Sequence, residues 1–159
     1  MNRQVVATTK MVELEAACRN RGLPFTVQRR VILEALAARD DHPTADEILE
    51  EVRARLPQVS RTTVYRVLDT LVKLGVVVKI CSPGTGTRFD PRTDRHHHLV
   101  CVQCEQVMDF EAPNLNALRL PDARKRAFEI HDYSIHFRGL CADCRAPTTV
   151  KPKKKEIKK

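Results

Sequence analysis

Hydrophobic positions in the N-terminal half recur at helical spacing in short segments. Residues 12–20 predict a first helix, which Gly22 and Pro24 end. Thr26 is a suitable N-cap for a second helix, since its hydroxyl can accept a hydrogen bond from an amide of the first turn. The stripe expected to be buried in this second helix consists of Val27, Val31, Ile32, Ala35 and Leu36.

Capping signals predict two further helices. Thr44 followed three residues later by Glu47 forms a capping box, and the helix that it begins is expected to end near Pro57. Ser60 can cap a fourth helix over residues 61–74, which Gly75 ends. Its apolar stripe follows i, i+3, i+4, i+7 spacing: Val64, Val67, Leu68, Leu71 and Leu74. The other side, called here the outer face, carries Arg61, Thr62, Tyr65 and Arg66.

Two short strands follow the fourth helix. Residues 76–81 read as a strand, residues 82–86 as a turn and residues 87–89 as the start of a return strand. Two helices with a short connection followed by a hairpin predict a winged helix-turn-helix. The outer face of the fourth helix fits the major groove of double-stranded DNA, since Arg can contact guanine or phosphate. A solvated helix face or a protein-binding winged helix is the alternative.

The C-terminal half is predicted to be a small α/β unit. We expect a polar hinge at 90–95, a strand pair within 96–110, a helix within 114–130 that Pro121 interrupts, and a strand at 131–140. The buried positions expected in that helix are Leu115, Leu118, Ala127 and Phe128. A core of about fifty residues is seldom stable alone, so we expect a homodimer. The predicted class is α+β, with a winged-helix domain at 1–89 and a dimerisation domain at 96–148.

Four cysteines form two Cys-x-x-Cys pairs: Cys101 with Cys104, and Cys141 with Cys144. This spacing suits one tetrahedral Zn²⁺ per subunit, with Zn–S distances of ~2.3 Å. Two disulfides are the alternative, and they are typical of secreted chains. We expect zinc, because no N-terminal apolar stretch has the length of a signal peptide.

Charge and hydropathy narrow the class of protein. The 159 residues include 28 Lys and Arg against 20 Asp and Glu, a formal net charge of +8. This balance favours a polyanionic partner, but much of it lies in the lysine-rich segment 149–159, expected to be a disordered tail. No segment approaches the ~20 apolar residues of a membrane span. We therefore expect a cytoplasmic protein without a membrane partner.

Several motifs in order resemble the ferric uptake regulator family. They are His-Pro-Thr-Ala-Asp-Glu-Ile at 42–48, Ser-Arg-Thr-Thr-Val-Tyr-Arg-Val-Leu at 60–68, Arg-Phe-Asp at 88–90 and His-His-His-Leu-Val-Cys-Val-Gln-Cys at 96–104. The second Cys-x-x-Cys pair completes the resemblance, which covers residues 11–146. It implies a dimeric, metal-responsive repressor rather than an enzyme, with zinc held by the four paired cysteines.

The resemblance also implies a regulatory metal between the two domains, Fe²⁺ or Mn²⁺, whose binding closes the dimer onto a palindromic operator. Carried over by position, its ligands are His42, Asp90, His96, His98 and Asp109. The chemistry is coherent without the family. Imidazoles at i and i+2 of a strand point to one side, and mixed His and carboxylate sets suit Fe²⁺, Mn²⁺, Co²⁺ or Zn²⁺ rather than Ca²⁺.

The residues give conflicting indications of whether the protein senses peroxide or a metal ion. In the family that the chain resembles, Asp at the position of Asp109 is typical of peroxide sensors, in which iron-catalysed oxidation of His42 or His96 destroys the site. Residues 65–67 instead resemble the iron-sensing branch, so an iron- or manganese-responsive uptake regulator is the alternative. A zinc sensor is disfavoured, since Cys18 and Cys81 are expected to be buried as small apolar residues.

Three further hypotheses concern the remaining chemistry. Many iron regulators have a second metal site in the dimerisation domain, but His97 and Tyr133 occupy two of its positions here. We do not expect that site to be intact, although His131 or His136 could substitute. A zinc hydrolase would need a nucleophile or a phosphate-binding loop, and none is recognised. A structural zinc adaptor that binds protein rather than DNA is the remaining alternative.

Overall fold

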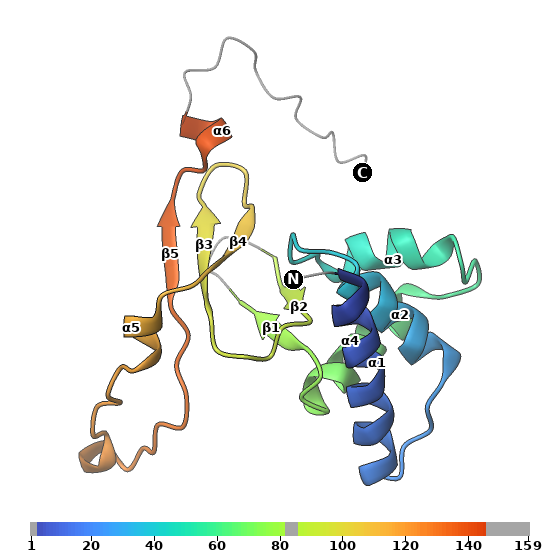
Figure 1. The fold of residues 1–159 in the computed structure, drawn as a ribbon, viewed down its shortest axis with the longest axis horizontal. Coiled ribbons are helices and arrows are strands. Elements are labelled where there is room, and N and C mark those ends of the chain that lie inside the picture. The colour runs from blue at the N-terminus through green and yellow to red at the C-terminus, as the bar shows by residue number, and fades with distance from the viewer. Residues whose placement is uncertain (1–2, 82–85, 146–159) are drawn as a thin grey trace.

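The computed structural model describes residues 3–81 and 86–145. Within these ranges a helical N-terminal half lies beside a C-terminal half built on a sheet, and a two-stranded hairpin lies between them (Figure 1). The arrangement confirms the predicted α+β class. Most of the predicted turn at 82–86 and the predicted tail at 149–159 lie outside the described residues. No described helix has the length and hydropathy needed to cross a membrane.

Four helices build the N-terminal core: α1 (Arg3–Asn20), α2 (Val27–Ala37), α3 (Ala45–Arg53) and α4 (Arg61–Lys73). Thr26 and Ser60 cap α2 and α4, each accepting from the amide three residues on. At α3 both hydrogen bonds of the predicted capping box form between Thr44 and Glu47. Helices α2, α3 and α4 contact one another and bury a shared apolar core that includes Ile32, Leu36, Ile48, Val52, Val64 and Leu68.

The hairpin consists of β1 (Val78–Ile80) and β2 (Arg88–Asp90), paired antiparallel. It is tied to the loop before α3, because the Phe89 amide donates to the Pro43 carbonyl at 3.0 Å. An isolated bridge between Thr44 and Arg88 adds a second link. The winged helix-turn-helix is therefore present as predicted, and its second wing strand leads directly to Asp90.

The C-terminal sheet has the order β4-β3-β5, formed by β3 (His97–Cys101), β4 (Val107–Phe110) and β5 (His136–Gly139). Strand β3 is antiparallel to β4 and parallel to β5. Three short helical turns complete this half: α5 (Pro113–Asn116), η1 (Arg124–Arg126) and α6 (Ala142–Arg145). The small second core joins Val100 and Val107 to Ile80 of the wing. The two halves are thus packed together through the hairpin.

Several predicted boundaries and burials are wrong. Helix α1 begins at Arg3 rather than at residue 12, and α3 ends at Arg53 rather than near residue 57. The wing strands are 78–80 and 88–90, so Asp90, the first residue of the expected hinge, also ends β2. Val27 is 63% exposed, because it occupies the first helical position and faces away from the core. Cys18 is buried as expected, whereas Cys81 is exposed.

The long helix predicted within 114–130 does not form, and only α5 and η1 are helical there. Pro121 cannot donate the amide hydrogen bond that a continuous helix requires, and Ala127 is left-handed at φ 52°. Leu118 and Phe128 are 48% and 63% exposed, since no second layer covers them within residues 3–81 and 86–145. The strand predicted at 131–140 is likewise confined to β5.

Candidate metal centres

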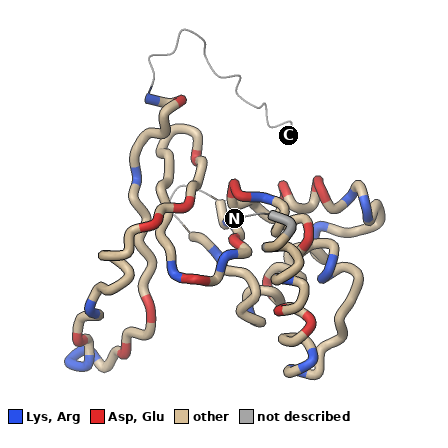
Figure 2. The backbone as a smooth tube through the Cα atoms, in the orientation of Figure 1, with Lys and Arg blue, Asp and Glu red and all other residues tan. Residues whose placement is uncertain are grey.

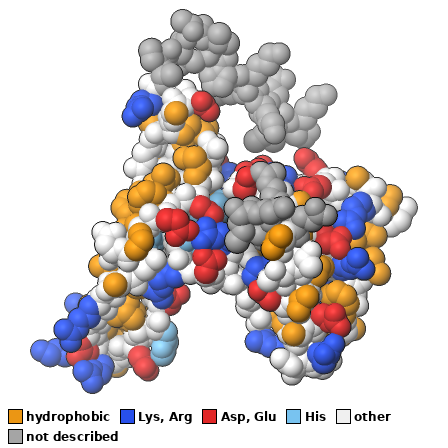
Figure 3. Space-filling model, in the orientation of Figure 1, with side chains coloured by type: hydrophobic (Ala, Val, Ile, Leu, Met, Phe, Trp, Pro, Cys, Tyr) orange, Lys and Arg blue, Asp and Glu red, His pale blue; other side chains and the backbone are white. Residues whose placement is uncertain are grey.

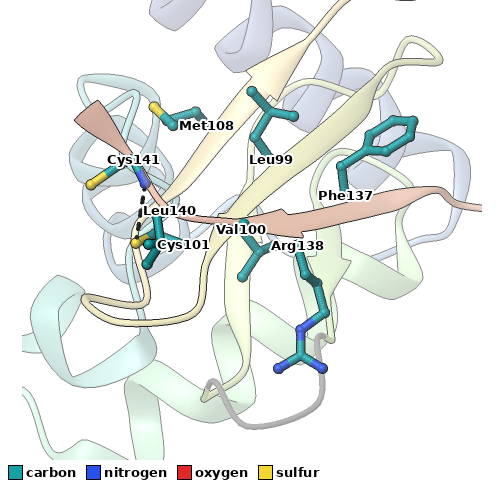
Figure 4. A pocket seen from close by; sticks show the side chains of 9 residues that line it. Leu99, Val100, Cys101, Met108, Phe137, Arg138, Leu140 and Cys141 are labelled. Carbon is teal, nitrogen blue, oxygen red and sulfur yellow. Dashed lines mark hydrogen bonds between the residues drawn. The ribbon is translucent and has the colours of Figure 1, made fainter. Parts of the chain in front are cut away.

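Two turns bring the four paired cysteines together at one end of the C-terminal sheet. Cys101 ends β3, Cys104 follows in the next turn, and Cys141 and Cys144 flank the start of α6. Their sulfur atoms all lie within 4.8 Å of one another. The Cys141 amide donates to Cys101 Sγ at 3.4 Å, a contact drawn in Figure 4, and Cys104 Sγ lies 3.7 Å from Cys141 Sγ.

The protonation of these thiols fits a cation at their centre. Hydrogen bonds from the backbone of Cys104 and Cys141 lower the pKa of Cys101 to about 6. Interaction with the neighbouring thiol of Cys141 raises the pKa of Cys144. Each thiolate therefore opposes the next unless a cation neutralises them, and all four are free thiols here. Four sulfurs that converge without bonding fit a tetrahedral zinc site rather than two disulfides.

A second cluster lies where the two halves of the chain meet. One donor atom from each of five residues converges, and all five atoms lie within 4.8 Å of one another. These residues are His42, Asp90, His96, His98 and Asp109, the set expected from the sequence. His42 precedes α3 and Asp90 ends β2, while the other three lie on or beside β3 and β4.

The side chains of the second cluster point their donor atoms inward. His42 Nε2 lies 2.7 Å from Asp109 Oδ1, and His96 Nε2 lies 2.8 Å from Asp90 Oδ2. His96 Nε2 and His98 Nε2 are 3.1 Å apart. The outer Nδ1 atoms of His42 and His96 contact the carbonyls of residues 107 and 94 at 3.3 and 2.8 Å. In neutral rings these contacts hold the proton on Nδ1 and leave the Nε2 lone pair free for a metal.

Charge in this cluster is balanced by protons that a divalent cation could replace. Burial lowers the pKa of His42, but hydrogen bonds to Asp109 and Asp90 outweigh it and raise the pKa to about 9. The same two carboxylates, Asp109 foremost, raise the pKa of His96 to about 10. Against the effect of burial, the histidines hold the pKa values of both carboxyls well below their usual range. Two imidazolium protons and one divalent cation carry equal charge, so the ligand set fits such a cation.

His42 is held in an uncommon backbone conformation. Its φ of 50° lies in the left-handed region, which non-glycine residues seldom occupy. Arg88 of the wing stabilises this turn, because its Nη1 donates to the His42 carbonyl at 3.0 Å. The His42 side chain is thereby buried against the C-terminal half, where its ring meets the His98 ring edge-on at 5.1 Å between centroids. The wing thus positions a residue of the second cluster.

The outer face of α4 is exposed, as predicted. This holds for all four of its residues: Arg61, Thr62, Tyr65 and Arg66. The Arg61 guanidinium lies 5.4 Å from the Tyr65 ring centroid and 2.8 Å from Asp46 Oδ2 of α3. Lys and Arg alternate with Asp and Glu along the helical half rather than forming one continuous tract (Figure 2).

The other described histidines, His97, His131 and His136, belong to neither cluster. Among the described residues, the groups of three or more His, Cys, Asp or Glu able to hold a metal are the two above. His97 is buried, and the His131 side chain is 79% exposed. His136 contacts the His98 ring at 5.4 Å between centroids. Arg92, whose guanidinium donates to Asp109, was not predicted from the sequence, because no local pattern indicates this long-range contact.

The fold and the two ligand clusters together define a winged-helix protein with the donor sets of two metal centres. The model of the ferric uptake regulator family matches residues 20–138. The chain belongs to the ferric uptake regulator family, and the members of this family are transcription regulators.

Three similar proteins illustrate the relationship. The peroxide-responsive repressor PerR of Staphylococcus aureus is 31% identical over 136 residues, which cover 86% of this chain and 92% of that protein. The Helicobacter pylori ferric uptake regulator shares the fold with a TM-score of 0.73 at 20% identity, covering 89% of this chain and 95% of that one. A zinc uptake regulator in complex with zinc and DNA has a TM-score of 0.64 at 26% identity, covering 91% and 95%.

Proposed function

We propose that this protein is a cytoplasmic, metal-dependent repressor that binds DNA as a homodimer. We divide it into a winged-helix domain at 1–89, a hinge at 90–95 and a dimerisation domain at 96–148. The observation that carries the proposal is the origin of the second cluster. Its donors come from both sides of the hinge: His42 belongs to the winged-helix domain, Asp90 lies where the wing meets the hinge, and the other three belong to the C-terminal half.

A ligand set divided in this way couples metal binding to the relative arrangement of the two domains. All five donors are within reach of one cation only when the two domains adopt one relative arrangement. A hundredfold preference for that arrangement requires about 2.7 kcal/mol of differential binding, two decades at about 1.4 kcal/mol each. In a dimer this arrangement fixes the separation of the two α4 helices. Both can then enter successive major grooves of a palindromic operator.

The four paired cysteines have a different role in this proposal. They hold α6 to the end of β3 and so connect β5, which α6 follows, to the centre of the sheet. One zinc per subunit would supply a fixed tetrahedral junction there. The second cluster, with nitrogen and carboxylate donors, would take the regulatory Fe²⁺ or Mn²⁺.

The C-terminal sheet offers a surface for a second subunit. Leu99, Met108 and Phe137 occupy paired positions on its three strands and project from one face beside the cysteines (Figure 4). Hydrophobic side chains gather over this half in the space-filling view (Figure 3). The large exposed ones in the described part of this half are Val102, Phe110, Leu118, Leu120, Phe128, Phe137 and Leu140. Apolar patches of this kind mark interfaces, which supports a homodimer.

The Arg66→Ala variant should bind DNA more weakly than the wild type. Loss of a base contact costs about 1–3 kcal/mol, or roughly five- to 150-fold in affinity. The test uses Mn²⁺-loaded protein, a duplex enriched from a random pool by the wild type, and fluorescence anisotropy. Arg124→Ala is the matched control, since the Arg124 side chain is 85% exposed in the C-terminal half. Equal affinities of the two variants for the duplex would contradict the role of α4 as the reading element, and failure of the wild type to enrich any duplex would favour a protein-binding adaptor.

We further propose that the signal is hydrogen peroxide. Asp109 at the last ligand position and the peroxide-responsive relative support this choice. Bound Fe²⁺ would activate the peroxide, and the two electrons that reduce it would come from the imidazole ring that is oxidised. In the net reaction one peroxide oxygen enters a ring C–H bond of His42 or His96, and the other leaves as water. The modified imidazole no longer completes the ligand set, so the dimer would release its operator.

Peptide mass spectrometry tests the peroxide proposal. Anaerobic protein loaded with Fe²⁺ and then treated with peroxide should gain one oxygen on the peptide holding His42 or His96. The Mn²⁺-loaded protein should not change, because Mn²⁺ does not readily reduce peroxide. Intact iron binding without oxidation would leave the second candidate, an iron- or manganese-responsive uptake regulator, which residues 65–67 favour. Operator binding driven by zinc alone would instead indicate a zinc sensor.

A further inference from the structure

Arg92 is bound to both carboxylates of the second cluster. It lies in the segment between β2 and β3, and its side chain is only 23% exposed. The Arg92 backbone amide donates to Asp90 Oδ1 at 2.7 Å, and its Nη1 donates to Asp109 Oδ2 at 3.0 Å. Its Nη2 donates to Glu111 Oε1 at 2.7 Å and also to Asp94. One hinge residue therefore contacts four carboxylates, two of them in the cluster.

In each of the two carboxylates, one oxygen faces the histidines and the other accepts a hydrogen bond from Arg92. Asp90 turns Oδ2 toward His96 at 2.8 Å, while its Oδ1 is held by Arg92. Asp109 turns Oδ1 toward His42 at 2.7 Å, while its Oδ2 is held by Arg92. Neither carboxylate has both oxygens free. Each can offer one donor atom to a cation, which with three imidazole nitrogens gives five protein donors.

We propose that Arg92 is a positioning residue whose guanidinium restricts Asp109 to one donor oxygen, as its backbone amide does for Asp90, and so fixes the protein's contribution to five ligands. The inference rests on the proposed metal site. A planar guanidinium can hold several carboxylates in fixed directions, which the single ammonium of lysine cannot do. Without it, Asp109 can rotate and present both oxygens, as unrestrained carboxylates do. The number of donors, and with it the room left for a further ligand, would then change.

Arg95 provides a matched control in the same segment. Its guanidinium pairs with Asp132 at 2.7 Å and lies 4.5 Å from the Tyr133 ring centroid. Among the interactions described for it, none reaches the five donors of the second cluster. Arg95→Ala therefore removes an arginine of equal size and charge from the hinge and leaves the carboxylates of the second cluster held.

Visible absorption of Co²⁺ in the second cluster tests the inference in the full-length, zinc-replete protein. The d–d bands of Co²⁺ weaken when five-coordinate geometry becomes six-coordinate. We expect the wild type and Arg95→Ala to give the same five-coordinate spectrum and affinity. Arg92→Ala should give weaker bands and bind Co²⁺ about 10- to 100-fold more weakly, the usual cost of losing a group that orients ligands. Arg92→Lys should give the weakened spectrum with a smaller loss of affinity.

The outcomes separate the role of Arg92 from the existence of the site. Circular dichroism measures whether each variant is folded. If Arg92→Ala does not fold, the comparison is made with Arg92→Lys. Wild-type spectrum and affinity in the folded Arg92 variants would overturn the inference and leave the metal site standing. A wild-type protein that binds no Co²⁺ beyond its zinc would overturn the site and the inference together. If Arg95→Ala changed the Co²⁺ spectrum and affinity as much as Arg92→Ala does, the loss of any positive charge in the hinge would explain the effect. That result would also contradict the inference.

Discussion

The Cys104→Ser variant should lose its zinc, its dimeric state and the folded C-terminal half. That half contains three short strands, and its core holds Val100 and Val107 with Ile80 of the wing. Structural zinc contributes an apparent ~10–16 kcal/mol in small zinc domains, whereas whole proteins are stable by about 5–15 kcal/mol. Removing one of four thiolates therefore removes most of what holds this half together. Light scattering after size exclusion, with zinc analysis, measures the result.

Cys81→Ser is the control for this experiment. Cys81 is exposed and belongs to neither ligand cluster. The substitution makes the same chemical change, so a dimer with one zinc per subunit is expected. The adverse result for the Cys104 variant would be a stable dimer with an unchanged melting temperature after zinc has been lost. The cysteine cluster would then not be structural.

His98→Ala should remain a folded, zinc-containing dimer that no longer responds to the regulatory metal. His98 is buried, and its Nε2 faces His96 Nε2 at 3.1 Å on the inner side of β3. Loss of one of five donors lowers metal affinity and removes a contact between the domains. We expect the ratio of operator affinity with and without Mn²⁺ to fall from about a hundredfold to near one. Anisotropy titrations on the enriched duplex measure this ratio.

His131→Ala is the matched substitution, because the His131 side chain is 79% exposed and outside both clusters. It should keep the full response to metal. Continued metal dependence in the His98 variant would show that the regulatory ligands lie elsewhere. A His98 variant that lost its zinc or its dimeric state would show that the two clusters do not act separately.

Local signals predicted the N-terminal half well, because its helices begin at residues that cap them. Thr26, Thr44 and Ser60 each accept a hydrogen bond from an amide of the first turn, as their positions indicated. The first nine residues of α1, residues 3–11, had no such signal. Lys10, in this unpredicted stretch, is buried by contacts with Glu13 and with Thr93 of the hinge. That contact spans the chain, so hydrophobic periodicity could not indicate it.

The C-terminal half was harder to predict because its apolar residues have few partners within one chain. Leu118 follows Leu115 at helical spacing, yet Leu118 and Phe128 are both exposed, and Pro121 lies between them. Motifs, by contrast, located both donor clusters, since chemistry constrains residue type and spacing more strongly than packing does. Arg92 was not predicted, because its role depends on a contact with Asp109 of β4 that forms only in the folded chain. The sequence carries no local mark of such a contact.

The most direct test of metal-dependent operator binding is one titration with the wild-type protein. A duplex enriched from a random pool is titrated with zinc-replete protein, once with Mn²⁺ and once with a chelator that leaves the zinc in place. We predict that the enriched sequence is two-fold symmetric and is bound about a hundredfold more tightly with Mn²⁺. Equal affinity in the two titrations, or enrichment of no sequence at all, would contradict the proposed function.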